Sequence, residues 1–449
     1  MSKIIDAVSI VMTFQDEIFA IQRQPFLRAF PGYWAFPGGK VDPGDESFYE
    51  VHSVTEKLDQ RLFGTAVREA QEELGIDLRE EIRAGRIERV DFFGLAVTPD
   101  FNPYRFATHF FRFHFIEKVT FMVDRNEARV SEWMSAAELL KRYNDGQILA
   151  VPPVIKVIEG LGKNPDVRTI VDLNFEYDSS RFVPYIESLK GIRQLMPLSH
   201  TLPPASRTNS FLIGDEGSPR IVLDPSPKDD EEYRKFKNTL NLFGVDQIML
   251  THHHPDHHER ATVLAREYNI PIILSEDTYQ RLIRLDSAYF ADINLVFLKD
   301  GDIVTRWLKR DVLVHAIPGH DEGHLALAPD DMSWFIAGDL FQGVGSVVIG
   351  GEEGNMSKYF KTLEKIIVMN PKVVYPSHGI GLGGVNILET TLEHRKVREN
   401  QVLTLHNQGL SVDEILKEIY IEVPQKLWPY ALQNIQKHLE KLKVDGKIT

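Results

Sequence analysis

One segment of the sequence concentrates side chains that bind transition metals. It reads THHHPDHH, from Thr251 to His258, and it holds five of the sixteen histidines within seven residues. In an extended segment His252 and His254 point the same way, and Asp256 and His257 follow closely enough to serve a neighbouring ion. Imidazole and carboxylate without thiolate are ligands of first-row divalent metals, of which Zn²⁺ is the commonest case. The segment predicts a metal centre rather than an ordinary polar strand end.

Further ligand-type residues follow short apolar runs later in the chain. The run at 312–316 precedes PGHDEGH, which offers His320 and His324. Two later runs precede GD and PSHG, which offer Asp339 and His378. In layered α/β folds, sites gather at the carboxyl ends of strands. We therefore expect these side chains to converge with the histidine segment.

A second group of candidate ligands lies in REAQEELGI. Glu69, Glu72 and Glu73 stand at i, i+3 and i+4, so a helix places their carboxylates on one face. Arg68 precedes Glu72 by one turn and can hold it by an ion pair, and Gly75 is a suitable helix stop. Clustered carboxylates repel one another unless a divalent cation such as Mg²⁺ or Mn²⁺ neutralises them. Such a centre suits diphosphate hydrolysis, and a solvated acidic helix face is the alternative.

Strand and helix patterns divide the chain into four blocks. We expect a first domain over 1–162, a connector over 163–190, a second domain over 191–393 and a helical cap over 394–449. In the first block the pattern predicts strands at 8–14, 18–21, 92–97 and 106–115 and helices around 62–75 and 135–143. In the second it predicts short buried strands at 221–223, 247–250, 272–274, 312–316, 334–337 and 373–375, alternating with helices. The cap ends in a two-strand hint at 441–448.

Composition limits the remaining function classes. The 449 residues include no cysteine, which excludes disulfides, thiolate nucleophiles and sulfur-based zinc sites. The formal net charge of -14 weighs against a nucleic-acid groove, which normally needs positive potential. No apolar stretch is long enough for a membrane helix and the first residues do not have the pattern of a secretory signal, so we expect a cytoplasmic protein with no membrane partner.

The glutamate segment resembles the Nudix box. From Gly39 to Ile76 the chain is similar to the pattern of a glycine, an acidic residue six positions on, and then R-E-U-x-E-E-x-G-U, where U is aliphatic. Asp45 takes the acidic position, and the 22 residues at 46–67 exceed the family's usual spacer by about 15. A similar interruption occurs in the peroxisomal coenzyme A diphosphatases, whose R-x-x-x-L-R-x-x-P-G-x-x-x-F-P-G-G signature also resembles the segment from Arg23 to Gly39. The resemblance implies an α/β/α sandwich in which Glu69, Glu72 and Glu73 bind Mg²⁺ or Mn²⁺, and Glu69 and Glu73 carry catalysis. It also implies an orienting role for Arg68 and a substrate-binding role for Arg23 and Arg28.

The histidine and aspartate pattern resembles the metallo-β-lactamase superfamily. This resemblance implies an αββα sandwich and two Zn²⁺ ions. It assigns His252, His254 and His320 to the first ion, Asp256, His257 and His378 to the second, and Asp339 to a bridge between them. Asp224 matches the aspartate that ends an early strand, and Asp256 is also given a catalytic role. PGHDEGH departs from the more usual G-H-T-x-G-H at Asp321, and His324 stays open between support and chemistry.

The closing segment and the absence of cysteine narrow the resemblance without deciding the substrate. The central domain is similar to glyoxalase II, and the tail resembles the winged-helix-like end of the mitochondrial β-lactamase-like endoribonucleases. We therefore expect an α/β multidomain hydrolase whose metal-bridging hydroxide cleaves an ester, thioester or phosphodiester. The fused Nudix domain would act on a nucleoside diphosphate derivative, with acyl-coenzyme A as one candidate substrate. Two alternatives stay open: cleavage of single-stranded RNA, and a non-catalytic Nudix domain that senses a nucleotide and regulates the metallo-hydrolase.

Overall fold

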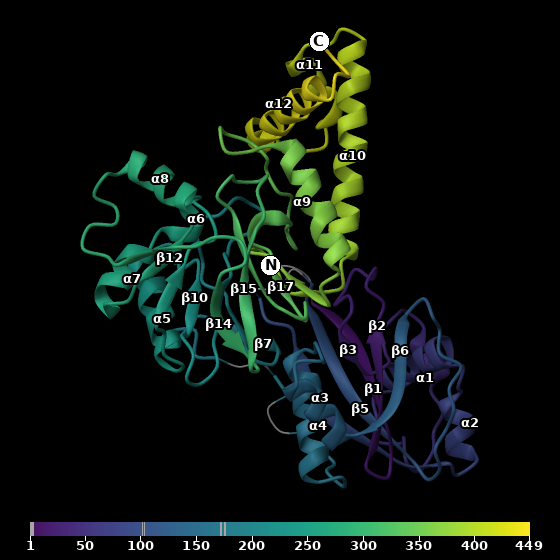
Figure 1. The fold of residues 1–449 in the computed structure, drawn as a ribbon. Coiled ribbons are helices and arrows are strands. Elements are labelled where there is room, and N and C mark those ends of the chain that lie inside the picture. Colours follow the sequence, from purple (N-terminus) through teal and green to yellow (C-terminus); the bar gives the residue numbers. More distant parts are fainter. Residues whose placement is uncertain (1–3, 101, 103, 171–172, 175–176) are drawn as a thin grey trace. The chain divides into compact units, whose positions relative to one another are not determined.

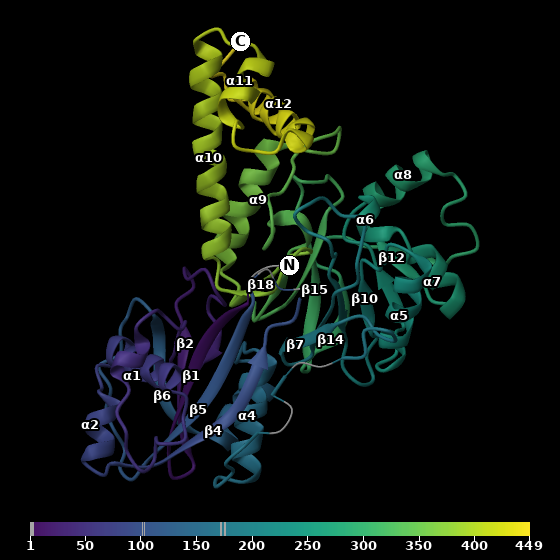
Figure 2. The same ribbon diagram turned by 180° about the vertical axis from the view of Figure 1, so that it is seen from behind.

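The computed structural model describes residues 4–100, 102, 104–170, 173–174 and 177–449. The chain divides into two compact units, which Figures 1 and 2 show from opposite sides. The first unit holds Met1–Asp178 with Ile186–Lys190, and the second holds Ser179–Tyr185 with Gly191–Thr449. Among the described helices, none has both the length and the apolar character that crossing a membrane requires.

The first unit is built on one mixed sheet of order β3-β2-β1-β5-β4, with β6 paired to β2. β1 and β5 run parallel, and the other neighbours run antiparallel. The strands are β1 (Ile5–Phe14), β2 (Glu17–Arg23), β3 (Trp34–Ala35), β4 (Ile87–Val97), β5 (Phe106–Phe115) and β6 (Ala128–Ser135). A further short strand, β7 (Tyr185–Leu189), follows in the chain.

Helices cover both faces of this sheet because side chains along its central strand alternate between two apolar cores. Val8, Ile10 and Met12 of β1 enter the core under α1 and α2, whereas Val11 enters the core under α3 and α4. The helices are η1 (Asp45–Phe48), α1 (Gln60–Leu74), α2 (Leu78–Arg83), α3 (Ala136–Asn144) and α4 (Pro152–Lys163). The arrangement is the expected α/β/α sandwich.

The second unit contains two facing sheets. One has the order β13-β12-β11-β10-β9-β8, with β10 to β13 parallel, and the other has the order β14-β15-β16-β17-β18-β19. The first is formed by β8 (Ile192–Leu195), β9 (Ser210–Ile213), β10 (Ile221–Leu223), β11 (Gln247–Met249), β12 (Ile272–Leu274) and β13 (Leu295–Phe297). The second is formed by β14 (Ile303–Trp307), β15 (Arg310–Ala316), β16 (Leu325–Pro329), β17 (Phe335–Ile336), β18 (Val373–Tyr375) and β19 (Leu382–Gly383).

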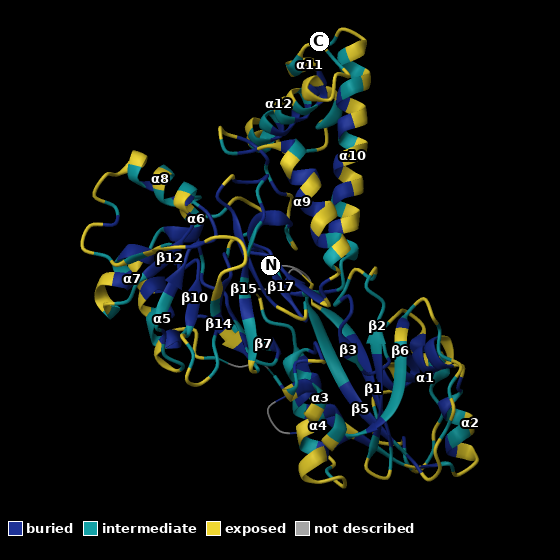
Figure 3. Cartoon of the chain, viewed as in Figure 1, coloured by how far each residue is buried: buried dark blue, intermediate teal, exposed yellow. Residues whose placement is uncertain are grey.

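Helices pack on the outer face of each sheet and complete an αββα sandwich. One core joins the first sheet to α5 (Asp230–Asn241), α7 (Ala261–Tyr268) and α8 (Glu276–Leu285). Another joins the second sheet to α9 (Met356–Met369) and the start of α10 (Asn386–Asn407). The central strands β10, β12 and β18 are buried throughout, and Figure 3 draws buried residues in dark blue. Two short helices, α6 (Pro255–His258) and η2 (Gly338–Leu340), follow strands β11 and β17.

The end of the chain forms a helical cap around its own small core. The cap consists of the last turns of α10 with α11 (Val412–Ile419), η3 (Gln425–Leu427) and α12 (Trp428–Val444). The capping box of Ser411 and Glu414 fixes the start of α11. In the second unit, the cap lies beside α9, as both ribbon views show.

Most elements expected from the sequence are present, and one is wrong. The strands expected at 106–115, 221–223, 272–274 and 373–375 coincide with β5, β10, β12 and β18. The two-strand hint at 441–448 is wrong, because α12 continues to Val444. Ile435, Leu439 and Leu442 recur at helical spacing and pack in the cap core, and this pattern outweighs the short alternation in KLKV.

Candidate functional site

The candidate metal ligands of the second unit all follow the carboxyl ends of strands. The histidine segment follows β11 and continues into α6, which carries Asp256 and His257. His320 follows β15, Asp339 lies in η2 after β17, and His378 follows β18. Both sheets therefore supply candidate ligands to one edge of the sandwich, where the sequence predicts them.

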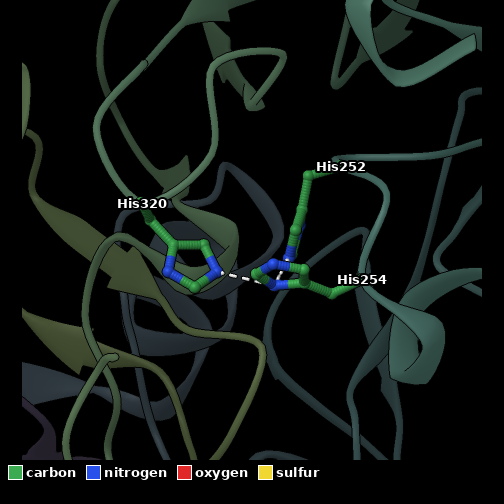
Figure 4. A group of neighbouring side chains, drawn as sticks. All are labelled: His252, His254 and His320. Atoms are coloured by element: carbon green, nitrogen blue, oxygen red, sulfur yellow. Dashed lines mark hydrogen bonds between the residues drawn. The ribbon is translucent and has the colours of Figure 1, made fainter. Parts of the chain in front are cut away.

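Three imidazoles form the first ligand group, which Figure 4 shows. The Nδ1 atom of His254 lies 3.0 Å from the Nε2 atom of His252 and 3.0 Å from the Nε2 atom of His320. Tetrahedral ligands about 2.05 Å from a Zn²⁺ ion would lie roughly 3.3 Å from one another. Both of these nitrogen–nitrogen distances are therefore close to the spacing that ligands of a single ion require, and all three nitrogens lie within 4.8 Å of one another.

A second group forms beside the first, and Asp339 contacts both. Asp256, His257 and His378 bring their ligand atoms within 4.8 Å of one another. The Oδ1 atom of Asp339 lies 3.4 Å from His378 Nε2, and its Oδ2 atom lies 3.7 Å from both His257 Nε2 and His320 Nε2. Asp339 is thus the only one of these carboxylates for which the structure shows contacts to imidazoles of both groups, which is the position of a bridging ligand.

Two of the converging atoms have no hydrogen-bonding partner among the described residues. His257 Nε2 and Asp339 Oδ1 are buried without a partner, although a buried polar atom left unpaired costs about 1–3 kcal/mol. Imidazole nitrogen and carboxylate oxygen are donors that divalent transition metals accept. The residues present therefore fit a pair of divalent cations.

The outward-facing ring atoms are held by the fold. His257 Nδ1 lies 2.9 Å from the buried carboxylate of Asp224, which also accepts hydrogen bonds from the backbone and hydroxyl of Thr251. His320 and His378 each direct Nδ1 to a backbone carbonyl, at 2.8 Å and 2.9 Å. Each of these bonds fixes the tautomer and leaves Nε2 free to bind a metal.

Electrostatics divides the histidines into two sets. Burial and neighbouring imidazoles lower the pKa of His252 well below its usual value and that of His320 to about 4. Both rings are therefore neutral at neutral pH, which is the form that binds a metal. Burial also acts to lower the pKa of His257, but the carboxylates of Asp256 and Asp339 raise it well above its usual value. A cation bound there would take the place of the proton.

Three residues around the first group acquire roles that the sequence pattern left open or missed. His324 Nε2 accepts a hydrogen bond from the backbone N–H of Asp339, so His324 helps to fix the position of Asp339. Asp321, which replaces the usual threonine, contacts His253 and accepts the N–H of Gly323 at 2.7 Å. Glu353 lies 3.5 Å from His254 Nε2, and no motif in the sequence indicated it.

In the first unit, Arg68 organises the glutamate helix. Its Nε and Nη2 atoms donate to the two carboxylate oxygens of Asp45 at 2.7 Å and 3.1 Å, and Thr65 donates to the same carboxylate at 2.7 Å. Arg68 Nη1 donates to Glu69 at 2.8 Å and to Glu72 at 3.0 Å. The expected ion pair at i, i+4 is present, and Asp45 occupies a buried position beside it.

The glycine turn contacts this helix despite the long spacer. The N–H of Gly38 donates to Glu73 at 3.0 Å, and a Cβ atom on Gly39 would lie only 2.2 Å from Glu69 Oε1. Gly75 ends α1 in the left-handed conformation, as expected. The insertion has therefore not displaced the turn from the glutamates.

The three glutamates are not gathered around one point. Among the described residues, they form no group whose ligand atoms lie within 4.8 Å of one another. Arg68 holds Glu69 and the exposed Glu72, whereas Glu73 turns to Gly38. Burial raises the pKa of Glu73 to about 8, and the Gly38 N–H opposes this shift. A cation would have to replace Arg68 as the partner of Glu69 and Glu72.

The two arginines expected to bind substrate have different settings. Arg23 donates Nε to the carbonyl of Ala29 at 3.2 Å, and its charge acts on the Glu73 carboxylate. Arg28 is exposed. Their substrate-binding role stays a prediction.

Three parts of this chain match known protein families. Residues 3–151 match the NUDIX domain, residues 203–378 match the metallo-beta-lactamase superfamily, and residues 411–449 match the beta-lactamase associated winged helix domain. The beta-lactamase-like protein 2 homolog of Drosophila melanogaster is 30% identical over 256 residues, which cover 54% of this chain and 84% of that protein. The chain belongs to the metallo-β-lactamase superfamily. It carries a NUDIX domain in addition.

Two other relatives extend the comparison. A hydroxyacylglutathione hydrolase of Bdellovibrio bacteriovorus is 26% identical over 213 residues, which cover 47% of this chain and 74% of that protein. The crystal structure of a beta-lactamase domain protein from Burkholderia ambifaria covers 60% of this chain and 90% of its own, with 20% identity and a TM-score of 0.51, and thus shares the fold. The lactamase domain and the NUDIX domain both belong to hydrolase families that use divalent metals.

We expect Arg68→Met to destabilise the NUDIX domain by about 3–5 kcal/mol, because it leaves the buried Asp45 carboxylate without its cation. Hydrogen exchange of α1 amides measures the loss. Arg61→Met on the same helix is the matched control, since the ion pair of Arg61 with Asp6 is exposed and contributes about 1 kcal/mol or less. Equal effects of the two substitutions would contradict the assigned role of Arg68.

We expect Asp224→Asn to weaken metal binding by the lactamase domain about 10–100-fold. An amide has one acceptor oxygen, whereas the Asp224 carboxylate accepts from Thr251 through both oxygens and from His257. Chelator competition measures the affinity. Glu267→Gln, on the exposed end of α7, is the control and should bind metal as the wild type does. Unchanged affinity in Asp224→Asn would show that the contact does not orient His257.

Proposed function

We propose that the lactamase domain is a dinuclear zinc hydrolase of thioesters or related esters. The observation behind the proposal is that imidazole and carboxylate atoms of two neighbouring groups converge, while His257 Nε2 and Asp339 Oδ1 have no hydrogen-bonding partner among the described residues. The hydroxyacylglutathione hydrolases among the relatives are, by name, hydrolases of a glutathione thioester, which favours a thioester over a phosphodiester. Ions held there would lower the pKa of a bound water and polarise the attacked carbonyl. The proposed ligands are His252, His254, His320, Asp256, His257, Asp339 and His378.

The chain's own residues supply orientation and a proton acceptor. Asp256 is less buried than His257 and His378, and its carboxylate lies 3.6 Å from His378 Nε2 and 3.8 Å from His257 Nε2. Asp256 is therefore more accessible to a substrate and to the attacking water than the two histidines are, while it stays close to both of them. We assign Asp256 the role of accepting the proton that the attacking water loses.

For the NUDIX domain we propose hydrolysis of a nucleoside diphosphate derivative such as coenzyme A, with Mg²⁺ or Mn²⁺. The contacts of Gly38 and Gly39 with the helix glutamates support this reading, because the turn and helix that define the box are in contact. An acyl-coenzyme A substrate would connect the two domains: one removes the acyl group, and the other splits the diphosphate.

One observation favours a sensor as the second candidate function. Arg68 already pairs with Glu69 and Glu72, so the positions that a cation would take are held by a guanidinium. A NUDIX domain in this state could bind a nucleotide without cleaving it. The other alternative is cleavage of single-stranded RNA by the lactamase domain, which a substrate screen distinguishes from thioester hydrolysis.

We expect the purified wild-type protein to bind two Zn²⁺ ions in the lactamase domain and to lose thioester hydrolysis when a chelator removes them. Elemental analysis and thiol release from a model acyl thioester provide the measurements. Asp339→Ala should reduce both the zinc content and the activity, because it removes the carboxylate between the two groups. Full activity in metal-free protein would refute the proposal.

A substrate screen by mass spectrometry then assigns each activity to a domain. We expect Asp256→Ala to abolish thioester cleavage only and Glu73→Gln to reduce diphosphate cleavage about 100-fold or more. Coenzyme A, its acyl esters, nucleotide sugars and a labelled single-stranded RNA form the panel. If Glu73→Gln changes no turnover but alters how a nucleotide affects the lactamase domain, the sensor reading replaces diphosphate hydrolysis. Chelator-sensitive cleavage of RNA alone would replace the thioester assignment.

A further inference from the structure

The segment from Val347 to Gly350 connects the proposed metal centre to the cap. His320 donates Nδ1–H to the carbonyl of Val348 at 2.8 Å, and this bond leaves the Nε2 lone pair facing His254. His320, Val347 and Ile349 are buried, and Val348 between the last two is half-buried. The position of one backbone carbonyl therefore sets the tautomer and the orientation of a proposed metal ligand.

Residues of α10 and α12 form hydrogen bonds with the backbone groups on either side of Val348. The N–H of Ile349 donates to Asn434 Oδ1 at 2.9 Å. Arg395 donates Nη2 to the carbonyl of Val347 and Nη1 to Asn434 Oδ1 at 3.2 Å. The backbone groups immediately before and after Val348 are thus fixed by side chains of the cap and of the helix that leads to it.

The cost of burying the Arg395 charge favours a positioning role for its hydrogen bond to Val347 over a purely stabilising one. Arg395 is only 3% exposed and forms no ion pair among the described residues, and its guanidinium lies 5.9 Å from the Tyr359 ring centroid. A buried charge without a counterion costs several kcal/mol unless hydrogen bonds compensate it. An apolar residue would fill the same space at lower cost, but it could not fix the Val347 carbonyl.

We propose that Asn434 and Arg395 are positioning residues of the metal centre, which act through Val348 on His320. The cap is then part of the apparatus that orders the first ligand group and does more than cover apolar surface. This inference rests on the proposed dinuclear zinc centre.

The test compares zinc binding by full-length variants in competition with a chromophoric chelator. We expect Asn434→Ala to weaken the binding of one of the two ions about 10–100-fold and to leave the other unchanged. Asn434→Asp keeps an acceptor for Ile349 and Arg395 and should bind both ions as the wild type does. In cobalt-substituted protein, Asn434→Ala should also alter the visible absorption of one site, because a freed His320 changes the ligand geometry.

Ile435→Val is the matched control, because Ile435 is the next residue of α12 and packs in the cap core. It removes one methyl group from that core without touching the segment at 347–350. Should Asn434→Ala fold poorly, Arg395→Lys provides a second variant with the same expected loss. Unchanged zinc affinity in the folded variants, or equal weakening by Ile435→Val, would overturn the inference. Failure of the wild type to bind two ions would instead overturn the proposed centre itself.

Discussion

The structure of the lactamase domain depends on holding buried imidazoles and carboxylates so that their candidate metal-binding atoms face one another. Among the described residues, His257 Nε2 and Asp339 Oδ1 are buried without a hydrogen-bonding partner, and each such atom costs about 1–3 kcal/mol of stability. The cost is tolerated because the opposite side of each ring or loop is anchored. The short strands, the turns after them and the outer hydrogen bonds all serve this requirement.

The anchors are of two kinds, and they differ in how they can be altered. Asp224 is a side chain that holds His257, so a substitution can remove its carboxylate. The acceptors for His320 and His378 are backbone carbonyls of Val348 and Arg207, so no substitution at those positions removes them. Their positions depend on whatever fixes the surrounding loop. For Val348 that support comes from residues almost 50 and more than 80 positions later in the chain.

The difference between side-chain and backbone anchors explains which parts of the site could be predicted from the sequence. The candidate ligands have distinctive residue types beside glycine or proline at strand ends, so they could be recognised before the fold was known. The same holds for Gly75, since a glycine after an apolar helical stripe is a common helix end. Val348 could not be recognised, because any residue supplies a carbonyl. Glu353 could not be recognised either, because it is one of two adjacent acidic residues in a glycine-rich loop, where such residues have many equally common roles.

The NUDIX domain is the opposite case, because its motif could be recognised from the sequence although the spacing within the motif is unusual. The inserted segment begins in η1, where the Asp45 carbonyl would lie 1.8 Å from a Cβ atom on Gly64 of α1. Glycine at that position lets the start of the insertion pack directly against the helix, and Arg68 then reaches the Asp45 carboxylate. The added residues leave from this junction and return at the start of α1, so the turn at Gly38 and Gly39 keeps its contact with Glu73 and Glu69. Insertion length is therefore a poor guide to whether the box is intact. Metal binding by the box depends on whether a cation displaces Arg68 from Glu69 and Glu72, because the guanidinium and a metal ion compete for the same carboxylate oxygens.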